Sequence, residues 1–230
     1  MQRGKLTQLI ENNKHAEETP RNYIGASSIG SECLRQIWYE YKGEKGEEIP
    51  NKLKRTWDIG KILEKYVVDL LRQLGLNILT DDLQVYFGSD KDNTFSMDWT
   101  EFSDPMVPYF KGHCDGLILD YKAILEIKTA KDSSFKQFVN EGCKKWNPKY
   151  YAQLQTYMGM SGINSSYILV LNKDNSDLFD ELVSFDADFY HLLREKAKMI
   201  HEAQIPPPRI NGSPLFYMCR MCQFRKVCHE

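Results

Sequence analysis

The sequence contains no long apolar segment, and no run approaches the ~20 residues that a membrane-spanning helix needs. The stretch from Met1 to Thr19 is polar and lacks the apolar core of a secretory signal. Internal repeats and low-complexity tracts are absent as well. We therefore expect a cytoplasmic protein of ordinary globular composition that acts without a membrane.

An excess of charge of one sign is also missing. Thirty basic and 32 acidic residues give a net charge of −2, which does not indicate a nucleic-acid-binding protein. The distribution is less even, because seven lysines and three acidic residues lie between Lys122 and Lys149, whereas the stretch from Asp90 to Asp104 is acidic. A local patch matters more than net charge for steering an anionic partner. On charge alone, however, a solvated lysine-rich face explains the cluster.

The hydrophobic periodicity predicts a single α/β domain over residues 1–230. Apolar spacing indicates helices at 28–41, 59–74, 148–159 and 188–203, with Ser28 and Asn147 as N-caps. Strand-like runs occur at 83–87, 110–119, 123–129, 166–171 and 181–185. This order fits a central mixed β-sheet flanked by helices. Three consecutive prolines, 206–208, open a cysteine-rich tail at 206–230.

The most informative segment is a pair of strand-like runs that carries Asp115 and then Glu126-Ile127-Lys128. If Asp120-Tyr121 forms a two-residue hairpin loop, Asp115 lies directly opposite Glu126 and shares its face of the sheet. Residues two apart in a strand share a face, so Lys128 joins them. The hairpin therefore predicts one patch that contains two carboxylates and a lysine.

Two explanations of this patch are open. The flanking apolar residues predict a largely buried strand, where isolated charge is costly. A cross-strand salt-bridge cluster would offset that cost, and so would a divalent cation. Carboxylate oxygens suit Mg²⁺ or Mn²⁺, and such an ion polarises a phosphoryl oxygen and acidifies water. Phosphodiester hydrolysis would use both effects, with the lysine orienting the water or stabilising developing charge.

The spacing Asp115-x(10)-Glu126-x-Lys128 resembles the signature of the PD-(D/E)XK nuclease superfamily. Gln153-x-x-x-Tyr157 resembles a motif of its RecB-type and phage-exonuclease branch, and this spacing places both side chains on one face of the 148–159 helix. The resemblance implies a restriction-endonuclease-like core, in which Gln153 and Tyr157 support the active site.

A third element of the resemblance is Gly60-x-x-x-Glu64, which matches the first motif of that branch. Many RecB-type members have a histidine near this place, so its absence argues against a histidine-dependent second metal. The resemblance implies a metal held by Glu64, Asp115, Glu126 and the main-chain carbonyl of Ile127, with Lys128 as the catalytic lysine.

In functional terms, the resemblance implies a Mg²⁺- or Mn²⁺-dependent exonuclease that hydrolyses single-stranded or unwound DNA ends. Its partners would be DNA and other proteins of recombination, repair or CRISPR adaptation, in a bacterial, archaeal or phage-infected host cell. Cleavage polarity and strand preference do not follow from these motifs.

Six cysteines occur, and an intracellular location argues against a disulfide framework. Cys219-x-x-Cys222-x(5)-Cys228 is tightly spaced and needs a fourth ligand to complete a metal site. Thiolates suit either an iron–sulfur cluster or tetrahedral zinc, and the spacing alone does not decide between them. The remaining Cys114 and Cys143 are expected to be ordinary buried thiols.

This tail, combined with the distant Cys33, resembles the iron–sulfur nucleases, among them CRISPR-associated iron–sulfur exonucleases and the nuclease domain of AddB-type helicase–nucleases. The resemblance implies a 4Fe–4S cluster that joins the two ends of the chain through Cys33, Cys219, Cys222 and Cys228. It favours iron–sulfur over zinc, for which His229 could replace a cysteine. The position of Arg35 is basic in many relatives and could contact a phosphate, but a surface arginine on the helix is the simpler interpretation.

Two functions of another class are alternatives. The chain could be a non-catalytic DNA-binding or adaptor module that uses the fold and the metal cluster only structurally. It could also be a zinc-stapled protein–protein module without a DNA role. The intact Asp–Glu–Lys set argues against the first, because a catalytically dead copy has no evident need for it.

Overall fold

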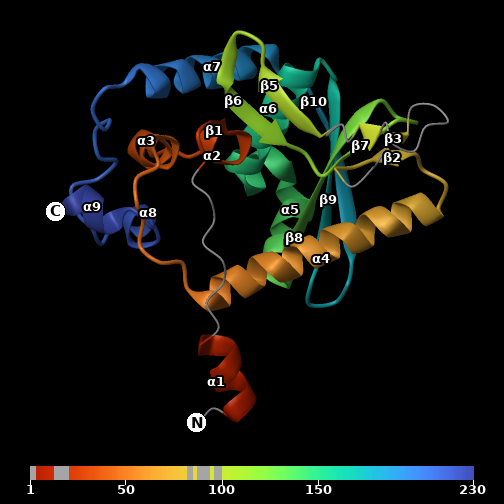
Figure 1. The fold of residues 1–230 in the computed structure, drawn as a ribbon. Coiled ribbons are helices and arrows are strands. Elements are labelled where there is room, and N and C mark those ends of the chain that lie inside the picture. Colours follow the sequence, from red (N-terminus) through yellow and green to blue (C-terminus); the bar gives the residue numbers. More distant parts are fainter. Residues whose placement is uncertain (1–3, 13–20, 82–84, 87–93, 96–99) are drawn as a thin grey trace.

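A five-stranded mixed sheet lies at the centre of the computed structural model, which describes residues 4–12, 21–81, 85–86, 94–95 and 100–230. Its strand order is β10-β9-β8-β7-β2 (Figure 1). β8 and β9 are parallel, and the other neighbours pair antiparallel. The strands are β2 (Ile78–Leu79), β7 (Gly116–Ile118), β8 (Ala123–Ala130), β9 (Ser165–Asn172) and β10 (Leu178–Ser184).

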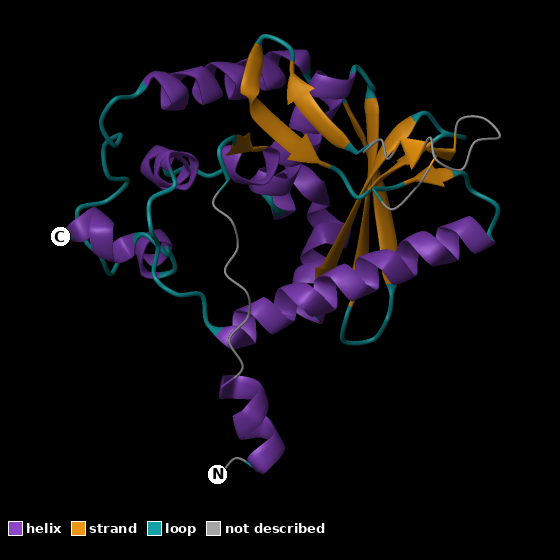
Figure 2. Cartoon of the chain, in the orientation of Figure 1, coloured by secondary structure: helices purple, strands orange, loops and turns teal. Residues whose placement is uncertain are grey.

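Helices cover both faces of this sheet (Figure 2). The long helix α4 (Asn51–Gln73) crosses one face, where its Val67 and Val68 pack against Leu125 and Ile127 of β8. Two helices, α5 (Asp132–Trp146) and α6 (Pro148–Ser161), cover the other face. The predicted α/β class, with a mixed sheet between helices, is therefore confirmed.

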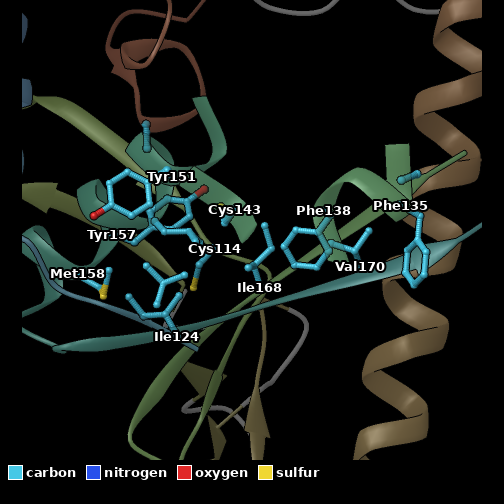
Figure 3. Packing of buried hydrophobic residues seen from close by; sticks show 14 residues of the cluster. Cys114, Ile124, Phe135, Phe138, Cys143, Tyr151, Tyr157, Met158, Ile168 and Val170 are labelled. Carbon is cyan, nitrogen blue, oxygen red and sulfur yellow. The ribbon is translucent and has the colours of Figure 1, made fainter. Parts of the chain in front are cut away.

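The apolar core on the α5/α6 face includes Phe138, Ile168 and Val170, which lie side by side (Figure 3). Helix α6 begins as predicted, since Asn147 caps it by accepting from the amide of Lys149 at 3.1 Å and Pro148 follows at the first helical position. Every residue of α6 from Tyr151 to Met158 is buried. A helix enclosed on all sides is a rigid support for side chains that it directs at the sheet.

A smaller sheet with the order β1-β6-β5 packs beside the first one, and helix α7 contacts both α6 and β6. Its strands are β1 (Ile24–Gly25), β5 (Glu101–Asp104) and β6 (Val107–His113); β3 (Val85–Tyr86) and β4 (Thr94–Phe95) form a separate pair. The remaining helices are α1 (Lys5–Asn12), α2 (Ala26–Ile29), α3 (Leu34–Lys42), α7 (Ala187–Glu202), α8 (Tyr217–Arg220) and α9 (Arg225–His229). No helix in the described ranges is long and apolar enough to cross a membrane.

The predicted helix at 28–41 is wrong in its first turns, because the chain forms α2, breaks, and starts α3 only at Leu34. Ser28 lies inside α2 and donates to the carbonyl of Gly25 at 3.1 Å, so it is not the N-cap. Gly30 stands at this break as the C-cap of α2. A Cβ there would lie 2.7 Å from the Cα of Lys149, so only glycine fits where the end of α2 meets α6.

The predicted strand at 110–119 is two strands in two different sheets, β6 and β7. The chain leaves the smaller sheet after His113 and enters the five-stranded sheet at Gly116. Asp115 therefore lies in the crossing between the sheets. Of the predicted strand at 83–87, Val85–Tyr86 forms β3, and the rest lies outside the described residues, as does most of the acidic stretch at 90–104.

Helix α4 is longer than the predicted helix at 59–74, and its apolar stripe is only partly covered. It begins at Asn51 and ends at Gln73, with Gly75 following in the left-handed region at φ 91°. The side chains of Ile59, Ile62 and Tyr66 are exposed, while Val67 and Val68 are buried. The stripe therefore contains a buried set that faces the sheet, with Val67 and Val68, and an exposed set that does not.

Candidate active site and cysteine cavity

The hairpin between β7 and β8 has the predicted register. Ile118 pairs with Ala123 and Gly116 pairs with Leu125, and the amide of Lys122 donates to the carbonyl of Leu119 at 3.2 Å. Asp120-Tyr121 is therefore the two-residue loop. The ladder with β8 starts at Gly116, one residue after Asp115, so Asp115 lies just beyond the end of the ladder and close to Glu126.

Asp115 is fixed to β8 through its side chain. Its Oδ2 accepts the main-chain N–H of Ile127 at 2.6 Å, at a point where β8 extends beyond its pairing with β7 and still pairs with β9. Burial raises the pKa of Asp115, although the Lys128 ammonium and the Ile127 amide both act to lower it. A hydrogen bond from the main chain thus holds this carboxylate next to Glu126.

Glu126 is the most enclosed carboxylate of the site, with an exposed fraction of 1%. Its Oε1 accepts from the ammonium of Lys128, whereas its Oε2 is buried and has no hydrogen-bond partner within the described structure. Burial raises the pKa of Glu126 to about 8, and the nearby Asp115 carboxylate adds to the effect. Unpartnered buried oxygens are rare in folded proteins because they cost free energy.

Glu64 reaches the same site from helix α4 and is half-buried. Burial and the Asp115 carboxylate raise the pKa of Glu64, and the positive charges of Lys128 and Lys61 oppose that shift. Electrostatic coupling of this kind requires the groups to be close. Glu64 therefore lies within electrostatic range of Asp115 and Lys128.

Lys128 lies between two partners. Its side chain is 17% exposed, and its ammonium contacts Glu126 and lies 5.1 Å from the ring centroid of Tyr150. Burial acts to lower the pKa of Lys128, but Glu126 and Asp115 outweigh it and the pKa is raised. The six other lysines between 122 and 149 are exposed, in keeping with a solvated face, so Lys128 is distinct among them.

Tyr150 is a site residue that the sequence analysis missed. It lies in the first turn of α6, three residues before Gln153 and thus on the same helix face. Nothing marks it in the sequence among 13 tyrosines. Only the packing of α6 on β8 brings its ring to Lys128.

Gln153 and Tyr157 do not line the site but support it through a hydrogen bond to the main chain. The Gln153 amide donates to the Tyr157 hydroxyl at 2.6 Å, and that hydroxyl donates to the main-chain carbonyl of His113. Both side chains are buried. They therefore hold the end of β6, two residues before Asp115.

Replacing Tyr157 by phenylalanine should lower the free energy of unfolding by about 1–3 kcal/mol, because the His113 carbonyl and the Gln153 amide would lose a buried partner. Urea denaturation of the variant and the wild type measures this difference. Tyr66→Phe, at an exposed position on α4, is the matched control and should change stability by less than about 0.5 kcal/mol. Equal stability of Tyr157→Phe and wild type would contradict a supporting role.

The four predicted cluster cysteines line one small cavity between α3 and the C-terminal tail. Cys33 stands at the start of α3, Cys219 lies in α8, Cys228 lies in α9, and Cys222 lies between those two helices. Figure 1 shows α8 and α9 beside α3, far from it in sequence. Burial raises the pKa of Cys219, and the neighbouring Cys228 and Cys33 raise it further.

The donor chemistry of both places fits a metal, although neither is preassembled. In the described part of the chain, no three histidine, cysteine, aspartate or glutamate side chains are arranged as they stand to hold a metal ion. The carboxylate site offers oxygen donors that include the unpartnered Oε2 of Glu126. The cysteine cavity offers four free thiols.

The two remaining cysteines and two nearby histidines lie as follows. Cys114 and Cys143 are buried thiols, as expected, and the Cys114 thiol donates to the carbonyl of Gly116 at 3.3 Å. His113 is exposed, with its Nε2 3.5 Å from Glu101. His229 lines the cysteine cavity, and its Nε2 is buried with no hydrogen-bond partner among the described residues.

Comparisons with known proteins place the fold. No family model matches the chain, and no curated protein does. Among solved structures, the alkaline exonuclease LHK-Exo of Laribacter hongkongensis aligns with a TM-score of 0.57 and 15% identity, over 79% of this chain and 87% of that chain.

Two further structures are similar. SSO0001 has a TM-score of 0.54 and 18% identity, over 98% of this chain and 96% of that chain. A phage-related exonuclease from Haemophilus somnus 129PT has a TM-score of 0.51 and 12% identity, over 77% of this chain and 91% of that chain. The α/β architecture derived from the residues is thus the fold found in these solved structures, two of which are named exonucleases.

Proposed function

We propose that this protein is a metal-dependent deoxyribonuclease whose active site is built around Glu126. The observation that carries the proposal is the buried Oε2 of Glu126, which has no hydrogen-bond partner in the described structure and lies beside Asp115 and Lys128. A salt bridge alone explains Oε1 but leaves Oε2 unsatisfied. A divalent cation would satisfy it and offset the clustered negative charge.

The metal would be held by carboxylates of Glu64, Asp115 and Glu126 and by the carbonyl of Ile127. The last ligand follows from strand geometry, because the N–H and C=O of one residue lie on the same strand edge. The N–H of Ile127 meets Asp115, so its carbonyl is directed to the same side. When bound, Mg²⁺ or Mn²⁺ would polarise the scissile phosphoryl group and acidify a water.

Lys128 would act on the transition state. Its raised pKa keeps it charged, and its contact with Tyr150 gives the ammonium a second partner next to Glu126. From this position the lysine would orient the attacking water or stabilise charge that develops on the phosphate. Gln153 and Tyr157 would keep the Asp115 segment in place.

The proposed substrate is DNA, cleaved from ends of single strands or unwound duplex. Two of the structures with this fold are named exonucleases, and LHK-Exo has also been solved in complex with dAMP. We propose partners among recombination, repair or CRISPR-adaptation proteins from the sequence resemblance alone.

A direct test of the function is digestion of end-labelled single-stranded and duplex DNA with Mn²⁺, with Mg²⁺ and with excess EDTA. The proposal expects shortening of labelled strands with either metal and none with EDTA. Binding without cleavage in every metal would instead favour the non-catalytic DNA-binding or adaptor module.

We further propose that the four-cysteine cavity holds a 4Fe–4S cluster that joins both ends of the domain. The support is the meeting of Cys33 with the tail cysteines around one cavity, together with the resemblance of their spacing. Zinc is the alternative occupant, and the unpartnered Nε2 of His229 in the same cavity favours it.

Replacing Cys33 by alanine should lower the melting temperature by several degrees, because one inorganic centre would close a loop of nearly the whole chain. Differential scanning calorimetry on anaerobically purified protein measures the shift. Elemental analysis of the same sample reports iron and zinc, and an assay of acid-labile sulfide reports the inorganic sulfur.

Cys143→Ala is the matched control, since Cys143 is a buried thiol outside the cavity, and it should retain the metal. About one zinc per chain without iron would refute the cluster and keep the four-ligand staple. Absence of both metals would refute the staple.

A further inference from the structure

Arg35 is not the surface arginine that the sequence suggests. It is half-buried in α3 and reaches the tail of the chain. Its Nε donates to the carbonyl of Pro207 at 2.5 Å, and one terminal nitrogen donates to the carbonyl of Pro206 at 3.4 Å. Its other terminal nitrogen lies 3.9 Å from the sulfur of Cys228, within hydrogen-bonding range for sulfur. All three nitrogens of the guanidinium therefore have partners.

Helix α3 also docks the tail through contacts that need no metal. Trp38 donates to the carbonyl of Ala203 at 2.9 Å, and the rings of Tyr39 and Phe224 lie 5.4 Å apart. These contacts hold the end of α7 and Phe224 of the tail against α3. Among the contacts of α3, that of Arg35 is the one that reaches a cysteine sulfur in the tail.

The chemistry of this contact points beyond docking. A guanidinium is always charged and presents several donors in a rigid plane. Two donors are fixed on the proline carbonyls, so the third is held in position before any metal binds. Hydrogen bonds to metal-bound sulfur stabilise negative charge on it and tune the metal centre.

We propose that Arg35 is a positioning residue of the four-cysteine site, which holds the Cys228 sulfur as a ligand and stabilises its negative charge. This inference rests on the proposed metal centre. Helix α3 would then contribute the ligand Cys33 at its N-cap and the donor Arg35 two residues later.

The test is the rate at which the purified chain loses metal to an excess of chelator, with iron and zinc counted by elemental analysis after desalting. Arg35→Gln should release metal about tenfold faster than wild type, as for loss of other groups that orient metal ligands. Arg35→Lys keeps the charge but loses the planar fork, so it should fall between the two. It also keeps the test valid if Arg35→Gln fails to fold.

Arg209→Gln is the matched control. Arg209 donates to the main-chain carbonyl of the same Cys228 at 2.6 Å. The substitution therefore removes a hydrogen bond to that residue but not one to its sulfur. It should release metal at nearly the wild-type rate. Equal release from Arg35→Gln and wild type, or equal acceleration by both arginine variants, would overturn the role of Arg35. A wild-type chain that holds no metal would instead refute the metal centre itself.

If the metal is iron, a second measurement separates charge stabilisation from simple docking. The reduced cluster carries more negative charge, so loss of the donor should favour the oxidised form about tenfold. That corresponds to a midpoint potential about 59 mV lower for a one-electron couple. An unchanged potential in Arg35→Gln would contradict stabilisation of the sulfur by this residue.

Discussion

Lys128→Ala should abolish DNA cleavage, by at least about 10²–10³-fold in kcat, while DNA binding is largely retained. The reason is that the ammonium would contribute mainly to the transition state, where charge develops on the phosphate. Cleavage of end-labelled DNA and equilibrium binding in Ca²⁺ would be measured side by side on the same preparation.

The structure sharpens this experiment, because alanine also leaves the buried Glu126 without its ion-pair partner. Lys128→Met keeps most of the side-chain volume and separates packing from charge. The control is Lys173→Met at an exposed lysine, which should cleave like wild type. Cleavage at the wild-type rate by both Lys128 variants would refute the assignment of the catalytic lysine.

Glu126→Gln should have an equally large effect, through the metal. Removal of this carboxylate takes away the central ligand, so cleavage should fall by at least about 100-fold at saturating DNA. The same variant should also lose the thermal stabilisation that Mn²⁺ gives wild type, which is about 2.7 kcal/mol when the ion is present at 100 times its Kd. Asp115→Asn and Glu64→Gln should also lower both the cleavage rate and the stabilisation by Mn²⁺.

Calcium provides a further control on the same preparation. It tolerates loose geometry and acidifies water poorly, so it should promote DNA binding with little turnover. Glu141→Gln, at an exposed position on α5, should respond to Mn²⁺ as wild type does. If Glu126→Gln kept both its activity and its stabilisation by Mn²⁺, the metal site would lie elsewhere. If only Glu64→Gln kept them, the ligand from α4 alone would be wrong.

The local geometry of the hairpin was predictable from sequence because two simple rules decide it. A two-residue loop sets the register, and alternation within a strand sets the faces. Asp115, Glu126 and Lys128 therefore meet as predicted, and the cap at Asn147 with Pro148 places α6 correctly.

The failures share a cause, which is tertiary packing between distant segments. The break between α2 and α3 depends on how closely Gly30 approaches α6, and no local pattern reports that approach. The split of the strand at 110–119 depends on a change of sheet at Asp115, which apolar alternation does not reveal.

Tyr150 and Arg35 show that the same limit of sequence-based prediction applies to the two proposed metal sites. The contact of Tyr150 with Lys128 and that of Arg35 with Cys228 join residues 22 and 193 positions apart in the chain. Each residue type is common on surfaces, and only the fold brings it to its partner. The spacing and the family resemblance together named the proposed ligands of both metal centres, whereas neither named Tyr150 or Arg35 as a supporting residue.

The most direct test of the metal-centred account is anomalous diffraction from crystals of the wild-type chain grown with saturating Mn²⁺. The account predicts a manganese peak bonded to Oε2 of Glu126, with Asp115 and the carbonyl of Ile127 as further ligands and with Lys128 turned toward Tyr150. Crystals with saturating Mn²⁺ that show no peak at Glu126, and an intact Glu126–Lys128 pair in its place, would contradict it.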